Sequence, residues 1–364
     1  MKGDSKNLNS NSNIKFVFAP INIGIAKHGI IDKHFIDFYS ERSGKKIDLT
    51  YVGNVAINEE YSTNFNTPFF VDTNLLEWGK LVEKIHYNGS QAGVQLGCRY
   101  YTNPALRKNT VQAQGTYVEK MITFIKNLDV TEIEKIIDEF VASSLIAAQL
   151  NFDWIQIHAA HGYFLSLLLS PEINKREDKY NYDDLHVIDK IVKGIRTCFK
   201  EIKIDIRISL LEGINSKERE FLERKSLISK LVEMDLDMIS FSNGLYDYDK
   251  QLIYPSQKDG FLPMYELAKF FLIKYPNMAW NFSGNVNDID KIRQLSTHDN
   301  LSLSIGRALI ADPEFLLLFD DGNKQRRAIE SPCNFCGSCH YYSNNETKLR
   351  CPQYQKKYNK QVLL

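Results

Sequence analysis

The sequence predicts an α/β protein of the (β/α)8 type, a TIM barrel with eight parallel strands. Three observations predict this fold. Eight apolar runs of strand length recur along the 364 residues. Amphipathic stretches with apolar residues at helical spacing lie between them. Except for 203–209, none of the runs is strongly polar at alternate positions, which is typical of parallel strands buried on both faces. An open, doubly wound sheet is the alternative.

The predicted elements follow one another in the order that such a barrel requires. The strands are expected at 16–20, 49–52, 92–96, 153–158, 203–209, 237–241, 278–282 and 301–305. The clearest helices are expected at 73–88, 131–150, 182–199 and 220–234. The second of these helices opens with Thr131 and has Glu134 three residues later, the signature of a capping box.

Composition and charge narrow the class of protein. Hydrophobic residues make up 43% of the chain and charged residues 25%, which excludes a disordered chain. The net charge is zero, so we expect no general electrostatic attraction to nucleic acid or to an anionic membrane, although local basic sites for small phosphates stay open. The polar residues 1–13 lack the apolar core of a secretory signal, and we expect a disordered tail and a cytoplasmic protein. The barrel is expected over 14–325, followed by a cysteine-rich extension over 326–364.

Polar residues stand where the predicted strands end, at the face of a barrel where active sites form. After the seventh and eighth strands come Gly284-Asn285 and Gly306-Arg307. Glycines let backbone N–H groups approach an anion closely, and a guanidinium matches phosphate oxygens. These residues predict a phosphate site, although glycines at such positions also serve only as turns.

His158, His161 and Tyr163 follow the fourth strand. Two histidines at this spacing suit zinc, but no third ligand is evident nearby. They also fit structural histidines. The interpretation we prefer is a pair of hydrogen-bond donors that hold a carbonyl oxygen. Tyr163 is then a candidate general acid.

Four cysteines crowd near the C-terminus, at Cys333, Cys336, Cys339 and Cys351. The first two intervals fit the ligand spacing of a four-iron cluster. Zinc held by four thiolates and free thiols are the alternatives.

Several segments resemble the old yellow enzyme family of NADH:flavin oxidoreductases, in family order. They are FAP at 18–20, Gln95-Leu96, the long stretch 152–180, DIRIS at 205–209, SGN at 283–285 and SIGRALIADP at 304–313. The resemblance implies that FMN is bound over the barrel mouth and is reduced by NADH or NADPH. It also implies a small-molecule substrate whose activated C=C bond is reduced. The resemblance does not decide between a monomer and a homo-oligomer.

The resemblance also implies residue roles. Gln95 would pair with the pyrimidine edge of the flavin, and Arg207 would lie beside its N1–C2=O side. His158 and His161 would bind the substrate carbonyl, and Tyr163 would protonate its Cα. The remaining contacts to the cofactor would come from Pro20, Ile21, Asn22, Asn54, Gly284, Asn285, Gly306 and Arg307.

Departures from the family pattern keep other functions open. Asn22 stands where the family usually has Thr or Cys, and 181–184 replaces the expected glycines. The cysteine segment resembles that of 2,4-dienoyl-CoA reductase and trimethylamine dehydrogenase. An amine dehydrogenase-like flavoenzyme and a catalytically degenerate module that binds flavin or metal are therefore the alternatives.

Overall fold

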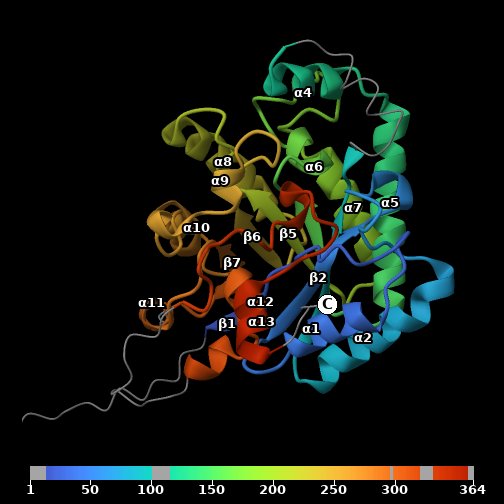
Figure 1. The fold of residues 1–364 in the computed structure, drawn as a ribbon. Coiled ribbons are helices and arrows are strands. Elements are labelled where there is room, and N and C mark those ends of the chain that lie inside the picture. The colour runs from blue at the N-terminus through green and yellow to red at the C-terminus, as the bar shows by residue number, and fades with distance from the viewer. Residues whose placement is uncertain (1–13, 101–114, 296–297, 320–330, 360–364) are drawn as a thin grey trace, which may run out of the picture.

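The computed structural model describes residues 14–100, 115–295, 298–319 and 331–359. Its centre is a closed barrel in which eight parallel strands pair in chain order and β1 pairs with β8 (Figure 1). This confirms the predicted TIM barrel. The strands are β1 (Lys15–Phe18), β2 (Leu49–Ala56), β3 (Gln91–Gly97), β4 (Trp154–Ala159), β5 (Lys203–Ser209), β6 (Met238–Ser242), β7 (Ala279–Ser283) and β8 (Leu301–Ile305).

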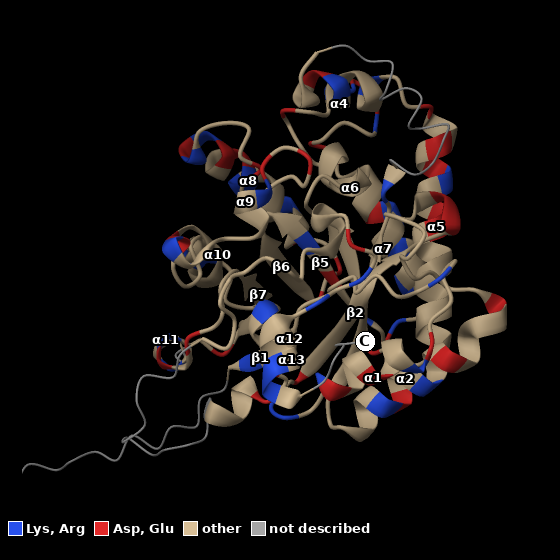
Figure 2. Cartoon of the chain, in the orientation of Figure 1, with Lys and Arg blue, Asp and Glu red and all other residues tan. Residues whose placement is uncertain are grey.

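The helices surround the strands and cover their apolar outer faces (Figure 1). They are α1 (Lys33–Glu41), α2 (Leu75–Tyr87), α4 (Tyr117–Lys126), α5 (Val130–Gln149), α6 (Phe164–Leu168), α7 (His186–Cys198), α8 (Lys217–Leu231), α9 (Lys250–Ile253), α10 (Tyr265–Lys274), α11 (Ile289–Gln294), α12 (Arg307–Ala311) and α13 (Pro352–Tyr358). Charges of both signs are mixed on these helices (Figure 2). No helix in the described part of the chain could cross a membrane.

The predicted capping box at Thr131 is wrong. The α5 helix is capped two residues earlier by Asp129, whose carboxylate accepts a hydrogen bond from the Thr131 backbone N–H. Glu134 instead forms ion pairs with Lys179 and Lys190. Because Asp129 already accepts the free N–H of Thr131 at the start of the helix, a capping box of Thr131 and Glu134 is not needed there.

Alternation along the strands divides the barrel interior into layers, because every second side chain points inward. The lowest layer is an apolar plug that contains Val17, Leu49, Trp154 and Met238. Two residues further along β4 and β6 come buried polar side chains, Gln156 after Trp154 and Ser240 after Met238. The next step upward reaches the mouth of the barrel. The sequence therefore excludes water from the base and gathers polar groups toward one end.

The C-terminal segment 331–359 packs against the barrel. The backbone N–H of Leu349 donates to the Ile23 carbonyl oxygen, just beyond β1. Tyr354 donates from its hydroxyl to Glu41, and Lys357 pairs with Asp312 beside α12. Figure 1 shows α13 next to α12 and the preceding coil crossing the barrel end. The predicted tail 1–13 and the predicted boundary near 325 lie outside the described residues.

Candidate active site

A cavity of about 900 Å³ opens at the carboxyl ends of the strands. The loops after the strands form its walls, which is where a TIM barrel carries its chemistry. Every residue predicted to bind cofactor or substrate lines it. These are Pro20, Ile21, Asn22, Asn54, Gln95, His158, His161, Tyr163, Arg207, Gly284, Asn285, Gly306 and Arg307.

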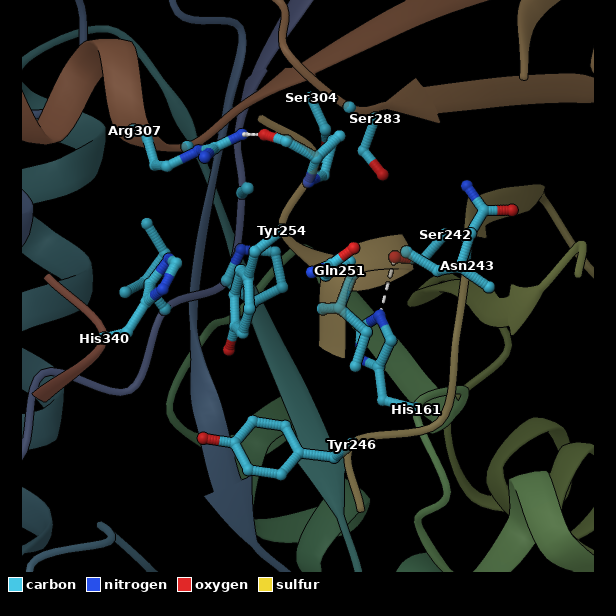
Figure 3. Close-up of a pocket in the computed structure, with 18 of the residues that line it drawn as sticks. His161, Ser242, Asn243, Tyr246, Gln251, Tyr254, Ser283, Ser304, Arg307 and His340 are labelled. Atoms are coloured by element: carbon cyan, nitrogen blue, oxygen red, sulfur yellow. Dashed lines mark hydrogen bonds between the residues drawn. The ribbon is translucent and has the colours of Figure 1, made fainter. Parts of the chain in front are cut away.

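His158, His161 and Tyr163 form one cluster. The ring centroids of the two histidines are 5.0 Å apart, and those of His158 and Tyr163 are 4.3 Å apart. His161 has a left-handed backbone, which turns its side chain toward β6. Its Nε2 lies 2.6 Å from the Ser242 hydroxyl oxygen (Figure 3). The cluster thus combines two imidazoles and a phenol on one wall of the cavity.

Both histidines are held in the neutral form. Burial lowers the pKa of His158 and of His161 well below the usual value, and the positive charge of Arg207 lowers them further. A neutral imidazole keeps one N–H donor, so each ring can donate to an uncharged oxygen without titrating. The Nδ1 atom of His158 is buried and has no hydrogen-bond partner in the described part of the chain.

Tyr163 is positioned by two residues to which the sequence assigned no role. Its hydroxyl lies 3.0 Å from the Thr63 hydroxyl, and the Arg99 guanidinium lies 5.0 Å from the centre of its ring. Burial raises the pKa of Tyr163, and Arg99 opposes part of that rise. The phenol therefore carries its proton at neutral pH. Thr63 lies in irregular chain after β2, where no periodicity marks it.

Gln95 and Arg207 project from β3 and β5. The Gln95 Nε2 donates to Gln156 at 2.6 Å, and Arg207 donates to Ser242 at 3.2 Å. Burial lowers the pKa of Arg207 to about 10, so it stays cationic at neutral pH. Its Nε atom is buried and unpartnered among the described residues.

Arg307 and Asn285 form the side of the cavity predicted to bind phosphate. The Arg307 guanidinium donates to the Asn285 side-chain oxygen and, at 2.6 Å, to the Pro255 carbonyl oxygen. Gly284 has a φ of +123°, a conformation that a residue with a Cβ rarely adopts. At Gly306 a Cβ would meet no atom closer than 3.8 Å, which leaves the backbone open to the cavity.

Asn22 and Asn54 line the cavity, but their side chains already have protein partners. The Asn22 amide donates to the Thr67 hydroxyl at 3.1 Å, and its oxygen accepts from the Gly24 backbone at 2.9 Å. Asn54 donates to Thr63 at 3.3 Å. A ligand would therefore contact atoms of Asn22 and Asn54 that take no part in these hydrogen bonds.

The C-terminal segment supplies a wall that the sequence did not predict. Phe335, His340 and Tyr341 all line the cavity. The His340 ring stacks on Tyr254 with centroids 3.8 Å apart (Figure 3). The Arg307 guanidinium lies 5.0 Å from the centre of the Phe335 ring. The sequence drew attention only to the cysteines of this segment.

The predicted metal site is not confirmed. Among the described residues, no group of three or more His, Cys, Asp or Glu side chains is arranged to hold a metal ion. The four cysteines also differ in environment, since Cys336 is exposed and Cys351 is buried. Cys333 and Cys339 line the cavity. Burial raises the pKa of Cys339 to about 12.

The cavity suits a flavin mononucleotide. Its volume lies within the range of cofactor sites, which is roughly 300 to 1,000 Å³. Arg307 offers charge for a phosphate, and Figure 3 shows it on the opposite side of Tyr254 from His161. The unpartnered His158 Nδ1 and Arg207 Nε are buried polar atoms that a ligand would satisfy.

Comparison with known proteins places the chain among the NAD(P)H-dependent flavin oxidoreductases. Residues 13–325 match the model of the NADH:flavin oxidoreductase / NADH oxidase family, and the chain belongs to that family. An NADH oxidase of Thermoanaerobacter brockii is 25% identical over 93% of this chain and 53% of its own length. The chain thus spans about half of that relative. An NADPH dehydrogenase of Bacillus subtilis is 22% identical over 79% of this chain and 84% of its own.

Solved structures share the fold. The old yellow enzyme of Pichia sp. AKU4542 has a TM-score of 0.67 at 17% identity, over 85% of this chain and 83% of that chain. A 2-naphthoyl-CoA reductase in complex with 2-naphthoyl-CoA has a TM-score of 0.76 at 16% identity, over 95% of this chain and 56% of that chain. These similarities confirm the predicted barrel.

Proposed function

We propose that the protein binds FMN in the cavity and uses NADH or NADPH to reduce an activated C=C bond of a small α,β-unsaturated carbonyl compound. The observation that carries this proposal is the cluster of two neutral imidazoles and a protonated phenol on one wall of the cavity. Neutral donors suit a carbonyl oxygen, and the phenol suits proton delivery to carbon. The predicted cofactor residues line the same cavity.

The residues that would hold FMN are Arg307 and the backbone at Gly284 and Gly306 for the phosphate, and Gln95 and Arg207 for the ring. The bound flavin would supply hydride to the substrate. Arg207 adds positive charge to that end of the cavity, because its pKa of about 10 keeps it protonated. Positive charge there favours an electron-rich ring.

The substrate would meet the His158–His161 wall. Each imidazole keeps one N–H, and two donors on a carbonyl oxygen draw electrons from the conjugated C=C bond. Tyr163 would then transfer its hydroxyl proton to Cα, and Thr63 at 3.0 Å holds that hydroxyl in place. The aromatic C-terminal wall would shield this reaction from water.

Anaerobic stopped-flow absorbance separates the two half-reactions. The purified protein is first mixed with NADPH or NADH, and flavin bleaching near 450 nm is followed. The reduced protein is then mixed with 2-cyclohexen-1-one. We expect reoxidation that depends on enone concentration. A flavin that is reduced but that no enone reoxidises would contradict the proposed substrate class, and a protein that binds no FMN would contradict the proposal as a whole.

A further inference from the structure

A connected set of buried polar side chains lies inside the barrel, directly below the cavity. We call it the polar layer, and its members are 4% exposed or less. They are Tyr51, Gln95, Gln156, Asp205, Ser240, Asn281 and Ser304. The strand register explains the layer, because Gln95 pairs with Gln156 on β4, and Gln156 pairs with Asp205 on β5. Three adjacent strands thus place these side chains side by side.

Asp205 is the one carboxylate of the polar layer. Its Oδ2 atom accepts hydrogen bonds from Tyr51 at 2.9 Å, from Ser240 at 2.7 Å and from the Gln156 side-chain amide. An ionised carboxylate only accepts hydrogen bonds, so each of these groups has to donate to it. Tyr51 donates its hydrogen bond from β2. The positive charge of Arg207 lowers the pKa of Asp205. Asp205 therefore sets the direction of the hydrogen bonds around it.

Gln156 carries this order of donors and acceptors from Asp205 to the cavity. The Gln156 Nε2 donates to Asp205 and, at 3.2 Å, to Ser240, which uses both of its N–H groups. Its Oε1 is left as an acceptor and receives the Gln95 Nε2 at 2.6 Å. The Gln95 side chain lines the cavity, so its carbonyl oxygen and second N–H remain for a ligand. A flipped Gln95 would set two carbonyl oxygens against each other.

We propose that Asp205 is a positioning residue that fixes, through Gln156, which atoms the Gln95 amide presents to the pyrimidine edge of FMN. This inference rests on the proposed function, which places that edge at Gln95. The ligand class it selects is a ring edge with an N–H beside a carbonyl, as the N3–C2 region of a flavin has. Asp205 itself touches no ligand, because Gln156 lies between it and Gln95.

The test compares FMN with N3-methyl-FMN, which lacks the ring N–H donor, in fluorescence titrations of flavin-free protein. Asp205→Asn removes the charge, and Gln156→Met breaks the link while Asp205 keeps Tyr51 and Ser240. Ser302→Ala is the matched control, since Ser302 lies inside the barrel and donates to the Trp280 carbonyl oxygen. The wild type and this control should bind FMN roughly tenfold more tightly than the methyl analogue.

In Asp205→Asn and Gln156→Met we expect weaker FMN binding, by roughly tenfold, and a preference over the analogue that shrinks at least threefold. Wild-type affinity and preference in both variants would overturn the inference. So would weaker binding with an unchanged preference, because that result means general packing. If Asp205→Asn does not fold, Gln156→Met decides by itself.

A second readout needs no flavin. The side-chain amide signals of Gln95, assigned by their loss in Gln95→Met, should include one proton protected from exchange in the wild type. That protection should disappear in Gln156→Met and fall in Asp205→Asn, and an unprotected wild-type signal would overturn the inference. If no FMN binds at all, the proposed function fails while this readout still tests the orientation of Gln95.

Discussion

The cavity has two walls of different origin. One wall consists of strand ends, where Gln95, His158 and Arg207 project from neighbouring strands of a hydrogen-bonded sheet. The other wall is the C-terminal segment, where His340 and Tyr341 are held by ring stacking and a few bonds to loops. The strand wall carries groups with chemistry, and the C-terminal wall carries rings that cover them. The contrast separates the parts that would act on a ligand from those that would enclose it.

The largest expected effect tests the chemistry of the strand wall. Tyr163→Phe should slow reoxidation of the reduced flavin by an enone by on the order of 100- to 10,000-fold, because the proton donor is lost. Reduction by NADPH should change little. Stopped-flow absorbance measures both steps. Tyr246→Phe is the matched control, since that phenol bonds Ser343 of the C-terminal segment at 3.0 Å. Equal losses in the two variants would contradict the assignment of Tyr163 as the proton donor.

The next effect tests how firmly the C-terminal wall is attached. Leu349 is fully buried, and Leu349→Ala should lower the free energy of unfolding by about 3 kcal/mol, through lost burial and the cavity left behind. Urea unfolding followed by circular dichroism measures this change. Leu317→Ala provides the control, because Leu317 is 44% exposed and should cost far less. A negligible effect at Leu349 would mean that the segment is not part of the folded core.

A smaller effect concerns the phosphate end of the cavity. Arg307→Met should raise the dissociation constant of FMN about 100-fold, because a charge-assisted pair with phosphate is lost. Fluorescence titration measures it, and Arg219→Met on the exposed face of α8 is the control. Retention of FMN with wild-type affinity would place the phosphate elsewhere. Riboflavin, which has no phosphate, should bind both variants equally.

The smallest effects are opposite changes in stability with pH. They concern Asp205 of the polar layer and His340 of the C-terminal wall. Burial raises the pKa of Asp205 to about 6, so its contribution to stability is full below pH 4 and is lost as the pH rises through 6. Burial lowers the pKa of His340 to about 4, so the folded state loses stability as the pH falls below 6.5. Asp205→Asn should therefore gain about 2 kcal/mol relative to the wild type between pH 4 and pH 7. His340→Gln should gain about 2 kcal/mol relative to the wild type as the pH falls from 7 to about 4.5.

Urea unfolding of flavin-free protein between pH 4.5 and 7.5 checks both signs. Gains that run in the same direction for the two variants, or curves parallel to the wild type, would contradict this assignment. The comparison uses differences between variants, so the many other titrating groups largely cancel.

The sequence predicted the strand wall because that wall is periodic. Alternation along a strand places His158 two residues beyond Gln156, and the strand order brings neighbours together at one end. Asp205 could have been found by the same rule, since it lies two residues before Arg207 on the same face. Thr63 and His340 could not, because they lie in irregular chain whose path depends on distant packing. The cysteine spacing remains an unconfirmed prediction of a metal site for a related reason, since spacing alone does not fix side-chain geometry.

The place of the C-terminal segment has a consequence for the order in which the molecule is made. Residues 331–359 follow all eight strands in the chain, so the ribosome delivers Arg307 and the barrel before it delivers His340 and Tyr341. A chain that has been made only as far as Arg307 therefore lacks the aromatic cover of the cavity. Lasting capture of a cofactor would then wait until residues 331–359 have been made and have packed over the barrel.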